Sequence, residues 1–180
     1  MSLRIYGNRS LKTLPGQATR PTPSRVRQAV FNIWQGRIDG CRWLDLCAGS
    51  GSMGAEALCR GATIAVAIEQ SSRAIAIITE NWQQVVNSEQ KIQIIRGDLV
   101  KKLPQLEGQQ FDRIYFDPPY ASELYLPVLQ AIAQYQLLAT SGELAVEYHP
   151  KIWQPPEIES LEICRDKVYG STAIAFYAPV

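Results

Sequence analysis

The fold of this 180-residue chain is decided by one stretch, Trp43-Leu44-Asp45-Leu46-Cys47-Ala48-Gly49-Ser50-Gly51-Ser52-Met53-Gly54. Its first five residues have the apolar character of a buried strand, and the Ala/Leu-rich segment that follows can form a helix. Between them, the spacing G-x-G-x-x-G allows a tight turn and a close approach of the backbone to a nucleotide-containing cofactor. Alone, the pattern fits dinucleotide-binding proteins and many glycine-rich turns equally well, so its meaning depends on the rest of the chain.

Acidic residues stand at the ends of the strand-like runs that follow. The run 64–69 ends in Glu69, about twenty-four residues after Asp45, where a carboxylate can accept hydrogens from ribose hydroxyls. The run 92–96 leads into Asp98, which could accept from an adenine amino group. Each acid taken alone fits a solvated loop or a helix cap better. Their shared position favours a ligand site, because open parallel sheets bind ligands beyond the carboxyl ends of their strands.

Strand-like and helix-like segments alternate from residue 42 onward. This βαβ rhythm predicts an α/β fold with a parallel sheet, right-handed crossovers and an antiparallel pair at its C-terminal edge. An amphipathic helix over 24–36, capped by Ser24 and ended by Gly36, precedes the sheet and follows an irregular arm. We expect one domain over 1–180, with the basic arm and first helix at about 1–36. The expected strands are 42–47, 64–69, 92–96, 111–116, 143–148, 158–164 and 172–177, and the other expected helices are 53–60, 72–87, 99–106 and 124–138.

A second motif, Asp117-Pro118-Pro119-Tyr120, directly follows the apolar run 113–116. The two prolines stiffen the turn, so that Asp117 and the Pro118 carbonyl become preorganised hydrogen-bond acceptors. Such acceptors suit methyl transfer to a planar amino nitrogen, whose lone pair is delocalised until its hydrogens are drawn out of plane. Tyr120 offers a flat face on which a base or amide plane can stack. The plain alternative is an ordinary proline turn.

Composition excludes several other classes of protein. An apolar content of 46% is ordinary for a globular protein, and no apolar run approaches the length of a membrane span. The start of the chain does not resemble a signal peptide, so we expect a cytoplasmic protein with reduced thiols. The four cysteines lack C-x-x-C spacing and there is one histidine, so no metal site is expected. No Ser/His/Asp set indicates a hydrolase.

The net charge of +1 conceals a strong asymmetry. Residues 1–42 contain eight Lys/Arg and one Asp, whereas the remainder contains ten Lys/Arg and sixteen Asp/Glu. A basic arm can bind phosphates, with a salt-dependent contribution to affinity, or it can simply pack over the domain as a solvated extension. We favour nucleic-acid binding. The candidate contacts are Arg4, Arg9, Lys12 and Arg20.

Six segments, spread along nearly the whole chain, carry a family resemblance: Arg20 to Ile33, Leu44 to Ala62, Glu69, Gly97-Asp98, Asp117 to Tyr120 and Tyr169 to Thr172. Together they resemble the motifs of class I methyltransferases that use S-adenosylmethionine, and more narrowly those of the RsmD-like family, which methylates guanine N2 in bacterial 16S ribosomal RNA. Departures from the family pattern are Cys47 for Phe, Gln28 for Glu, and Ser52-Met53 for Ala-Leu.

The resemblance implies a Rossmann-like, seven-stranded, mostly parallel sheet with one antiparallel strand and helices on both faces. It further implies S-adenosylmethionine as the cofactor and ribosomal RNA or the small ribosomal subunit as the partner. We also expect a monomer. Base binding is expected at Asp117, Pro118, Pro119 and Tyr120. The arm is expected to cover the methionine end of the cofactor through Thr22, although Arg20 and Thr22 could only anchor the arm. The other implied cofactor contacts are Asp45, Gly49, Gly51, Glu69 and Asp98.

Three alternatives remain open. A DNA adenine-N6 or protein glutamine methyltransferase would act on a similar planar amino group. A nicotinamide oxidoreductase would use the same glycine-rich fold but leaves the Pro-Pro-Tyr turn unexplained. A ribosome-assembly factor without enzymatic activity would keep the fold and bind RNA.

Overall fold

The computed structural model of the protein describes residues 2–14 and 24–180. Its described helices are α1 (Ser24–Ile33), α2 (Ser52–Cys59), α3 (Ser72–Val85), α4 (Leu99–Lys102) and α5 (Tyr125–Gln134), with the short 3-10 helices η1 (Tyr6–Asn8) and η2 (Leu103–Leu106). Its described strands are β1 (Ser2–Ile5), β2 (Arg9–Lys12), β3 (Arg42–Leu46), β4 (Ile64–Glu69), β5 (Lys91–Arg96), β6 (Phe111–Phe116), β7 (Leu138–Tyr148), β8 (Leu161–Tyr169) and β9 (Thr172–Pro179).

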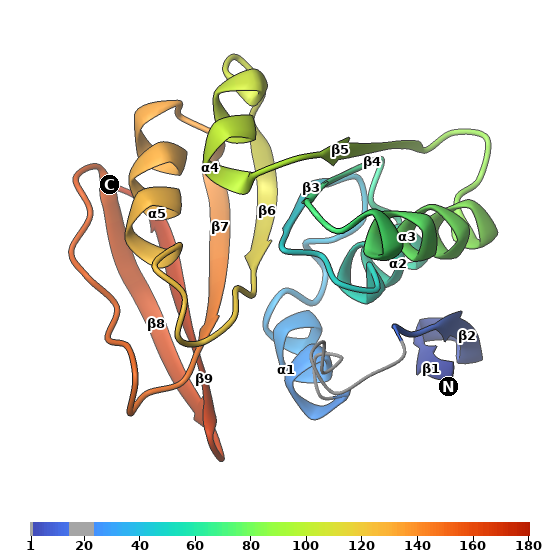
Figure 1. Ribbon diagram of the computed structural model, residues 1–180, viewed down its shortest axis with the longest axis horizontal. Helices are drawn as coiled ribbons and strands as arrows, with labels where there is room; N and C mark the ends of the chain where they lie inside the picture. Colours follow the sequence, from blue (N-terminus) through green and yellow to red (C-terminus); the bar gives the residue numbers. More distant parts are fainter. Residues whose placement is uncertain (1, 15–23) are drawn as a thin grey trace.

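Seven strands form the central sheet in the order β5-β4-β3-β6-β7-β9-β8 (Figure 1). The pairs from β5 to β7 are parallel, and β9 is antiparallel to both β7 and β8. The prediction of a seven-stranded, mostly parallel sheet with an antiparallel strand near the C-terminus is confirmed. Since β3, β4, β5 and β6 run in one direction, their carboxyl ends meet at one edge, where the acidic residues were expected to gather.

Helices cover both faces of the sheet because successive strand residues point to opposite sides. Leu44 and Leu46 of β3 pack in the layer that contains α4, η2 and α5. Trp43 packs in the opposite layer, against α1, α2 and α3. Figure 1 shows α4 and α5 on one side of β6 and β7, with the other three helices on the other side. Among the helices of the described residues, none has both the length and the apolar character needed to cross a membrane.

The N-terminal arm was predicted to be irregular, and this prediction was wrong for its first part. Strands β1 and β2 pair antiparallel, and Gly7 (φ 72) and Asn8 (φ 59) form the turn between them. The hairpin buries Ile5 and Leu11 against the domain. Four-residue strands that carry Arg, Ser and Lys offer little of the β-branched alternation by which strands are found in a sequence.

Two buried polar side chains hold the hairpin to the domain. Arg27 of α1 donates from Nε to Glu56 Oε2 at 2.7 Å and from Nη2 to the Arg4 carbonyl at 2.7 Å. Asn81 of α3 accepts from the Lys12 N–H at 2.9 Å and donates from Nδ2 to the carbonyls of Lys12 (2.9 Å) and Ser50 (2.8 Å). Asn81 therefore joins the hairpin to the glycine-rich loop.

Several element boundaries in the C-terminal half also differ from expectation, including the starts of β7 (Leu138 rather than 143) and β8 (Leu161 rather than 158). Helix α5 ends at Gln134 rather than near 138, because Gln136 has a left-handed backbone (φ 49) and β7 begins at Leu138. The apolar pair Leu137-Leu138 extends the helical pattern in the sequence, but both residues pack into the sheet core. Strand β8 continues to Tyr169 instead of ending near Cys164, where a register shift between Ile163 and Arg165 interrupts the alternation.

Candidate active site

A cavity of about 810 Å³ opens at the carboxyl edge of the sheet. This volume lies within the range of small-molecule sites, on the order of 300 to 1,000 Å³. The cavity brings together predicted site residues that are up to 75 positions apart in the sequence, from Asp45 to Tyr120. The predicted site residues that line it are Asp45, Gly49, Glu69, Asp98, Asp117, Pro118, Pro119 and Tyr120.

The three glycines of the loop have different physical reasons for being glycine. A Cβ on Gly49 (φ 57) would have no neighbour within 4 Å, so this glycine leaves the backbone open toward the cavity. A Cβ on Gly51 would lie 2.7 Å from Trp82 Nε1, and one on Gly54 would lie 2.2 Å from Trp82 Cζ2. Gly51 is not among the described residues that line the cavity. It supports the loop from behind, where its carbonyl accepts from Trp82 Nε1 at 2.7 Å.

Asp45 lines the cavity and is almost completely buried. Its Oδ2 accepts the Gly54 N–H at 3.0 Å, which ties the end of β3 to the first turn of α2. Burial raises the pKa of Asp45 to about 7, the Gly54 hydrogen bond lowers it, and the charge of Glu69 raises it further. A cationic group of a bound ligand near this carboxyl would favour its ionised form.

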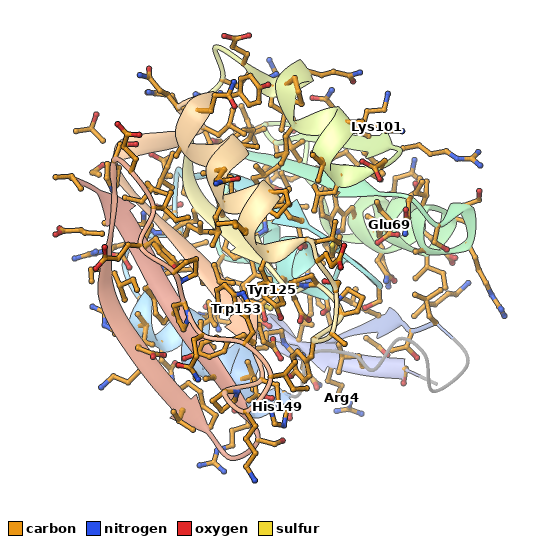
Figure 2. All side chains as sticks on the ribbon, turned by 60° about the vertical axis from the view of Figure 1, so that its left-hand side comes forward. Arg4, Glu69, Lys101, Tyr125, His149 and Trp153 are labelled. Atoms are coloured by element: carbon orange, nitrogen blue, oxygen red, sulfur yellow. The ribbon has the colours of Figure 1, made fainter. Side chains whose placement is uncertain are left out.

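Glu69 joins the loop to the start of α3. Its Oε1 accepts from the N–H groups of Gln70 and Ser71, both at 2.9 Å, and its Oε2 accepts from the Gly49 N–H at 3.3 Å. These bonds fix the carboxylate. Oε1 uses both of its lone pairs on the two N–H groups, whereas Oε2 keeps one for a hydroxyl donor. Figure 2 labels Glu69 beside α3.

Asp98 both caps α4 and lines the cavity. Its Oδ1 accepts from the Lys101 N–H at 3.0 Å in the first turn of that helix. The helix-cap interpretation of this acid is thus confirmed, and it is compatible with a ligand contact because the carboxylate has further lone pairs.

The four residues of the Asp117-Pro118-Pro119-Tyr120 turn also line the cavity. Where the chain leaves β6, the Asp117 N–H donates a long hydrogen bond (3.4 Å) to the Leu46 carbonyl of β3. The turn is closed by the Ser122 N–H, which donates to the Pro119 carbonyl at 2.8 Å. The Tyr120 hydroxyl donates to Glu147 Oε1 at 3.1 Å and lies 2.8 Å from Thr172 Oγ1. Burial raises the pKa of Tyr120 to about 12, with the Glu147 charge adding to the rise and the Thr172 hydrogen bond opposing it. The phenol is therefore neutral at ordinary pH.

Several cavity residues were not predicted from the sequence. Glu147 of β7 is 2% exposed and accepts the hydroxyl hydrogens of Tyr115 and Tyr120. Burial raises its pKa, and the two tyrosine hydrogen bonds oppose that rise. The sequence signal that could have identified Glu147 is its place as an acid within the otherwise apolar run 144–148. The cavity is also lined by Tyr169, Ser171 and Thr172 from the C-terminal part of the chain and by Leu14, Arg25 and Val26 from the N-terminal part.

Cys47 lines the cavity with a left-handed backbone (φ 61). Burial raises the pKa of its thiol, and the charges of Glu69 and Asp117 raise it further. A neutral thiol is a poor nucleophile, so the side chain contributes shape rather than chemistry. Within 2–14 and 24–180, no group of three or more His, Cys, Asp or Glu side chains could hold a metal ion.

The predicted RNA-binding residues lie elsewhere. Arg4 is on the hairpin, where Nη1 donates to Asn8 Oδ1 at 2.7 Å, and Figure 2 labels it there. Arg9 is exposed on β2, and Lys12 is ion-paired with Glu80 of α3. None of these three lines the cavity. Arg20 and Thr22 lie outside the described residues.

Comparisons with known proteins identify the family of the chain. The model of the family described as "Conserved hypothetical protein 95" matches residues 3–178. The chain is 33% identical over 171 residues to "Putative rRNA methyltransferase YlbH" of Bacillus subtilis, covering 94% of this chain and 92% of that protein. It is 27% identical over 179 residues to "Ribosomal RNA small subunit methyltransferase D" of Escherichia coli K12, covering 97% and 89%. The solved structure "Putative methyltransferase yhhF from Escherichia coli" superposes with a TM-score of 0.86 at 27% identity, covering 99% of this chain and 98% of that one. The chain therefore belongs to the conserved hypothetical protein 95 family, the RsmD family of methyltransferases.

Proposed function

We propose that this protein transfers a methyl group from S-adenosylmethionine to the N2 amino group of a guanine in small-subunit ribosomal RNA. One observation carries the proposal: the Asp117-Pro118-Pro119-Tyr120 turn and the acids Glu69 and Asp98 line one cavity. A cofactor site and a site for a planar amino group thus meet at a single edge of the sheet. The relatives named as ribosomal RNA methyltransferases support the same substrate class.

The described residues fit the proposed cofactor. Gly49 leaves open space where the backbone must come close to a ligand, and Glu69 and Asp98 supply fixed carboxylates for hydroxyl and amino hydrogens. The cavity lies beyond strand ends, the usual ligand position in this type of sheet. S-adenosylmethionine would supply a methyl group on a positively charged sulfonium, and the acids around the cavity would favour that charge.

Asp117 is proposed to accept a hydrogen from the target amino group, with the Pro118 carbonyl as the second acceptor. As the nitrogen becomes tetrahedral and positively charged, these hydrogen bonds strengthen, so they stabilise the transition state more than the ground state. Tyr120, a neutral phenol held at its hydroxyl, provides the face on which the base stacks. No strong base is required, because the proton can leave to water after methyl transfer.

The target guanine would have to be unpaired or splayed from its stack to reach this cavity. Arg4 and Arg9 of the hairpin are proposed to contact phosphates, and Lys12 could do so after leaving Glu80. Ribosomal RNA or the small subunit is the proposed partner, in the cytoplasm, with the protein acting as a monomer.

The test is to incubate the protein with methyl-labelled S-adenosylmethionine and, separately, unmodified ribosomal RNA, assembled small subunits, duplex DNA and a glutamine-bearing release factor. Mass spectrometry then identifies the labelled product. We expect N2-methylguanine from ribosomal RNA or small subunits. Label on adenine or glutamine would instead support one of the other planar-amino methyltransferases, and cofactor binding without label would support an assembly factor.

A further inference from the structure

Beneath Tyr120, three neighbouring strands direct polar side chains to the same face of the sheet. Tyr115 of β6 pairs in register with Ala145 of β7, so Glu147, two residues further along, points to the same side as Tyr115. Glu147 is itself opposite Ile174 of β9, and Thr172 lies two residues from Ile174, again on that side. The parallel and antiparallel pairings together place the three side chains in one row at the carboxyl edge.

Hydrogen bonds connect this row to Tyr120. Glu147 Oε2 accepts the Tyr115 hydroxyl hydrogen, and Oε1 accepts the Tyr120 hydroxyl hydrogen at 3.1 Å. A phenol carries one hydrogen, so when Tyr120 donates to Glu147, the 2.8 Å contact with Thr172 has the Thr172 hydroxyl as donor. The chain of donors therefore runs from Thr172 through Tyr120 to Glu147.

The ring of Tyr120 is thus held at several points. Its backbone belongs to the double-proline turn, its hydroxyl is bonded on two sides, and its ring meets the His149 ring edge-on at 5.7 Å and 64°. Figure 2 labels His149 on the segment that follows β7. A stacking face held in this way needs little reorganisation when a planar group binds.

A buried carboxyl group is costly unless donors compensate it, and an apolar residue could fill the same volume without that cost. Glu147 is 2% exposed, lines the cavity and has no described ion-pair partner; its described side-chain partners are the two tyrosine hydroxyls. Its position at the cavity therefore indicates a functional reason for an acid at this point.

We propose that Glu147 is a positioning residue for methyl transfer, which acts by fixing the Tyr120 ring through its hydroxyl, and that Thr172 holds the same hydroxyl by a second hydrogen bond. The inference rests on the proposed methylation of a planar amino nitrogen and adds the residues that set the geometry of its stacking face. This role requires no contact between Glu147 and the reacting nitrogen or methyl group. Its effect on the rate passes through Tyr120.

A double-mutant cycle tests this route. Single-turnover rates are measured at saturating cofactor and substrate for E147Q, Y120F and E147Q/Y120F. Each single variant should be about tenfold slower, the lower range expected for losing a hydrogen bond to a charged group. The double variant should be no slower than Y120F, because Y120F removes the bond that E147Q weakens: an amide offers one acceptor oxygen for the Tyr115 and Tyr120 hydroxyls where the carboxylate offers two. Losses that multiply to about 100-fold, or wild-type rates in both single variants, would overturn the inference.

The matched control is Y125F. The Tyr125 hydroxyl donates to the backbone carbonyl of Glu147 at 3.1 Å, and Tyr125 does not line the cavity. Y125F removes a buried phenol hydroxyl beside the same residue without touching Tyr120, so its rate should stay within about twofold of wild type, whatever its stability. Should E147Q fail to fold, T172V with Y120F forms the same cycle from the other side of the phenol.

A second readout needs no substrate. In protein labelled with carbon-13 at the tyrosine ε positions, the Tyr120 resonance is the one that is missing from Y120F. E147Q and T172V should increase the mobility of this ring, and Y125F should leave it unchanged; an unaltered ring in E147Q would refute the proposal even if no substrate were methylated. Label on adenine or glutamine in wild-type reactions would overturn the proposed guanine specificity alone, since the cycle can be measured on that substrate.

Discussion

Trp82 donates its indole N–H to the carbonyl oxygen of Gly51 across 2.7 Å, which seats the glycine-rich loop on α3. Trp82 is fully buried, and a Cβ on either Gly51 or Gly54 would collide with its ring. The second and third glycines of the motif are therefore needed for packing, whereas the first faces the cavity. This division makes the three positions separable by experiment.

Gly51→Ala should destabilise the fold by roughly 2 to 4 kcal/mol, because it adds a clash with Trp82 to a left-handed backbone. Gly49→Ala has the backbone cost without the clash and should lose about 1 kcal/mol. Urea denaturation of both variants provides the comparison. Equal losses would mean that packing on Trp82 is not what requires Gly51.

Asp117→Ala should lower the methyl-transfer rate about 100-fold at saturating cofactor and substrate, the size expected for one preorganised transition-state hydrogen bond. Cofactor affinity, measured by calorimetry, should change less than about twofold, because Asp117 is assigned to the substrate. A rate close to that of the wild type would refute this assignment.

Glu69→Ala, unlike Asp117→Ala, should act mainly on the cofactor and weaken its binding about tenfold. The change removes the proposed ribose contact and releases the N–H groups of Gly49, Gln70 and Ser71 from their acceptor. Calorimetric titration with S-adenosylmethionine measures the loss, and Glu69→Gln, which retains one acceptor oxygen, should lose less. Unaltered affinity in Glu69→Ala would exclude the ribose contact.

The raised pKa of Asp45 predicts a pH-dependent stability. With a folded pKa of about 7 against an ordinary value of 3.8, the folded protein holds a proton that the unfolded chain has released. The stability that this bound proton contributes is complete below pH 3.8. It is lost as the pH rises from there to about 7, at no more than roughly 1.4 kcal/mol of unfolding free energy per pH unit. Asp45→Asn lacks this loss, so its unfolding free energy relative to wild type should increase from pH 5 to 7 and then level off. A constant difference in unfolding free energy across pH 5 to 8 would contradict the raised pKa of Asp45. The raised pKa of Glu147 affects both proteins equally, so its contribution cancels in the difference.

Arg9→Ala should weaken RNA binding and reduce the slope of log affinity against log salt by about one. Lys101→Ala is a suitable control, because Figure 2 places Lys101 on α4, well away from Arg4 and the hairpin. Filter binding at several salt concentrations distinguishes the two variants. The same slope in both would remove the hairpin from the proposed RNA interface.

The sequence predicted those parts of the fold that depend on local pattern. Three largely apolar runs identified β3, β4 and β6, since strands buried on both faces are almost continuously apolar. The first contains Asp45, the second ends in Glu69 and the third is followed by Asp117. The hairpin was missed because its four-residue strands are stabilised by distant partners, such as Arg27 and Asn81, rather than by their own composition.

The parts of the site that depend on local pattern were predictable as well. Acids at strand ends could be placed together because parallel strands share an edge. The packing role of Gly51 could not be predicted, because Trp82 is 31 residues away and its contact depends on how α3 lies against the loop. Glu147 was missed because its place in the site depends on the pairing of β7 with β6, which brings it beside Tyr115, and the residues around Glu147 do not predict that pairing.

The Asn81 bridge has a practical consequence for experiments that shorten the chain. Its amide bonds both to Lys12 at the end of the hairpin and to Ser50 in the loop beside the cavity, and it is fully buried. Deleting the hairpin would leave two of these bonds unmade and let water reach the back of the loop. A truncated protein that loses activity would therefore report damage to the cofactor pocket as much as lost contact with RNA, and point substitutions on the hairpin surface are the cleaner way to separate the two.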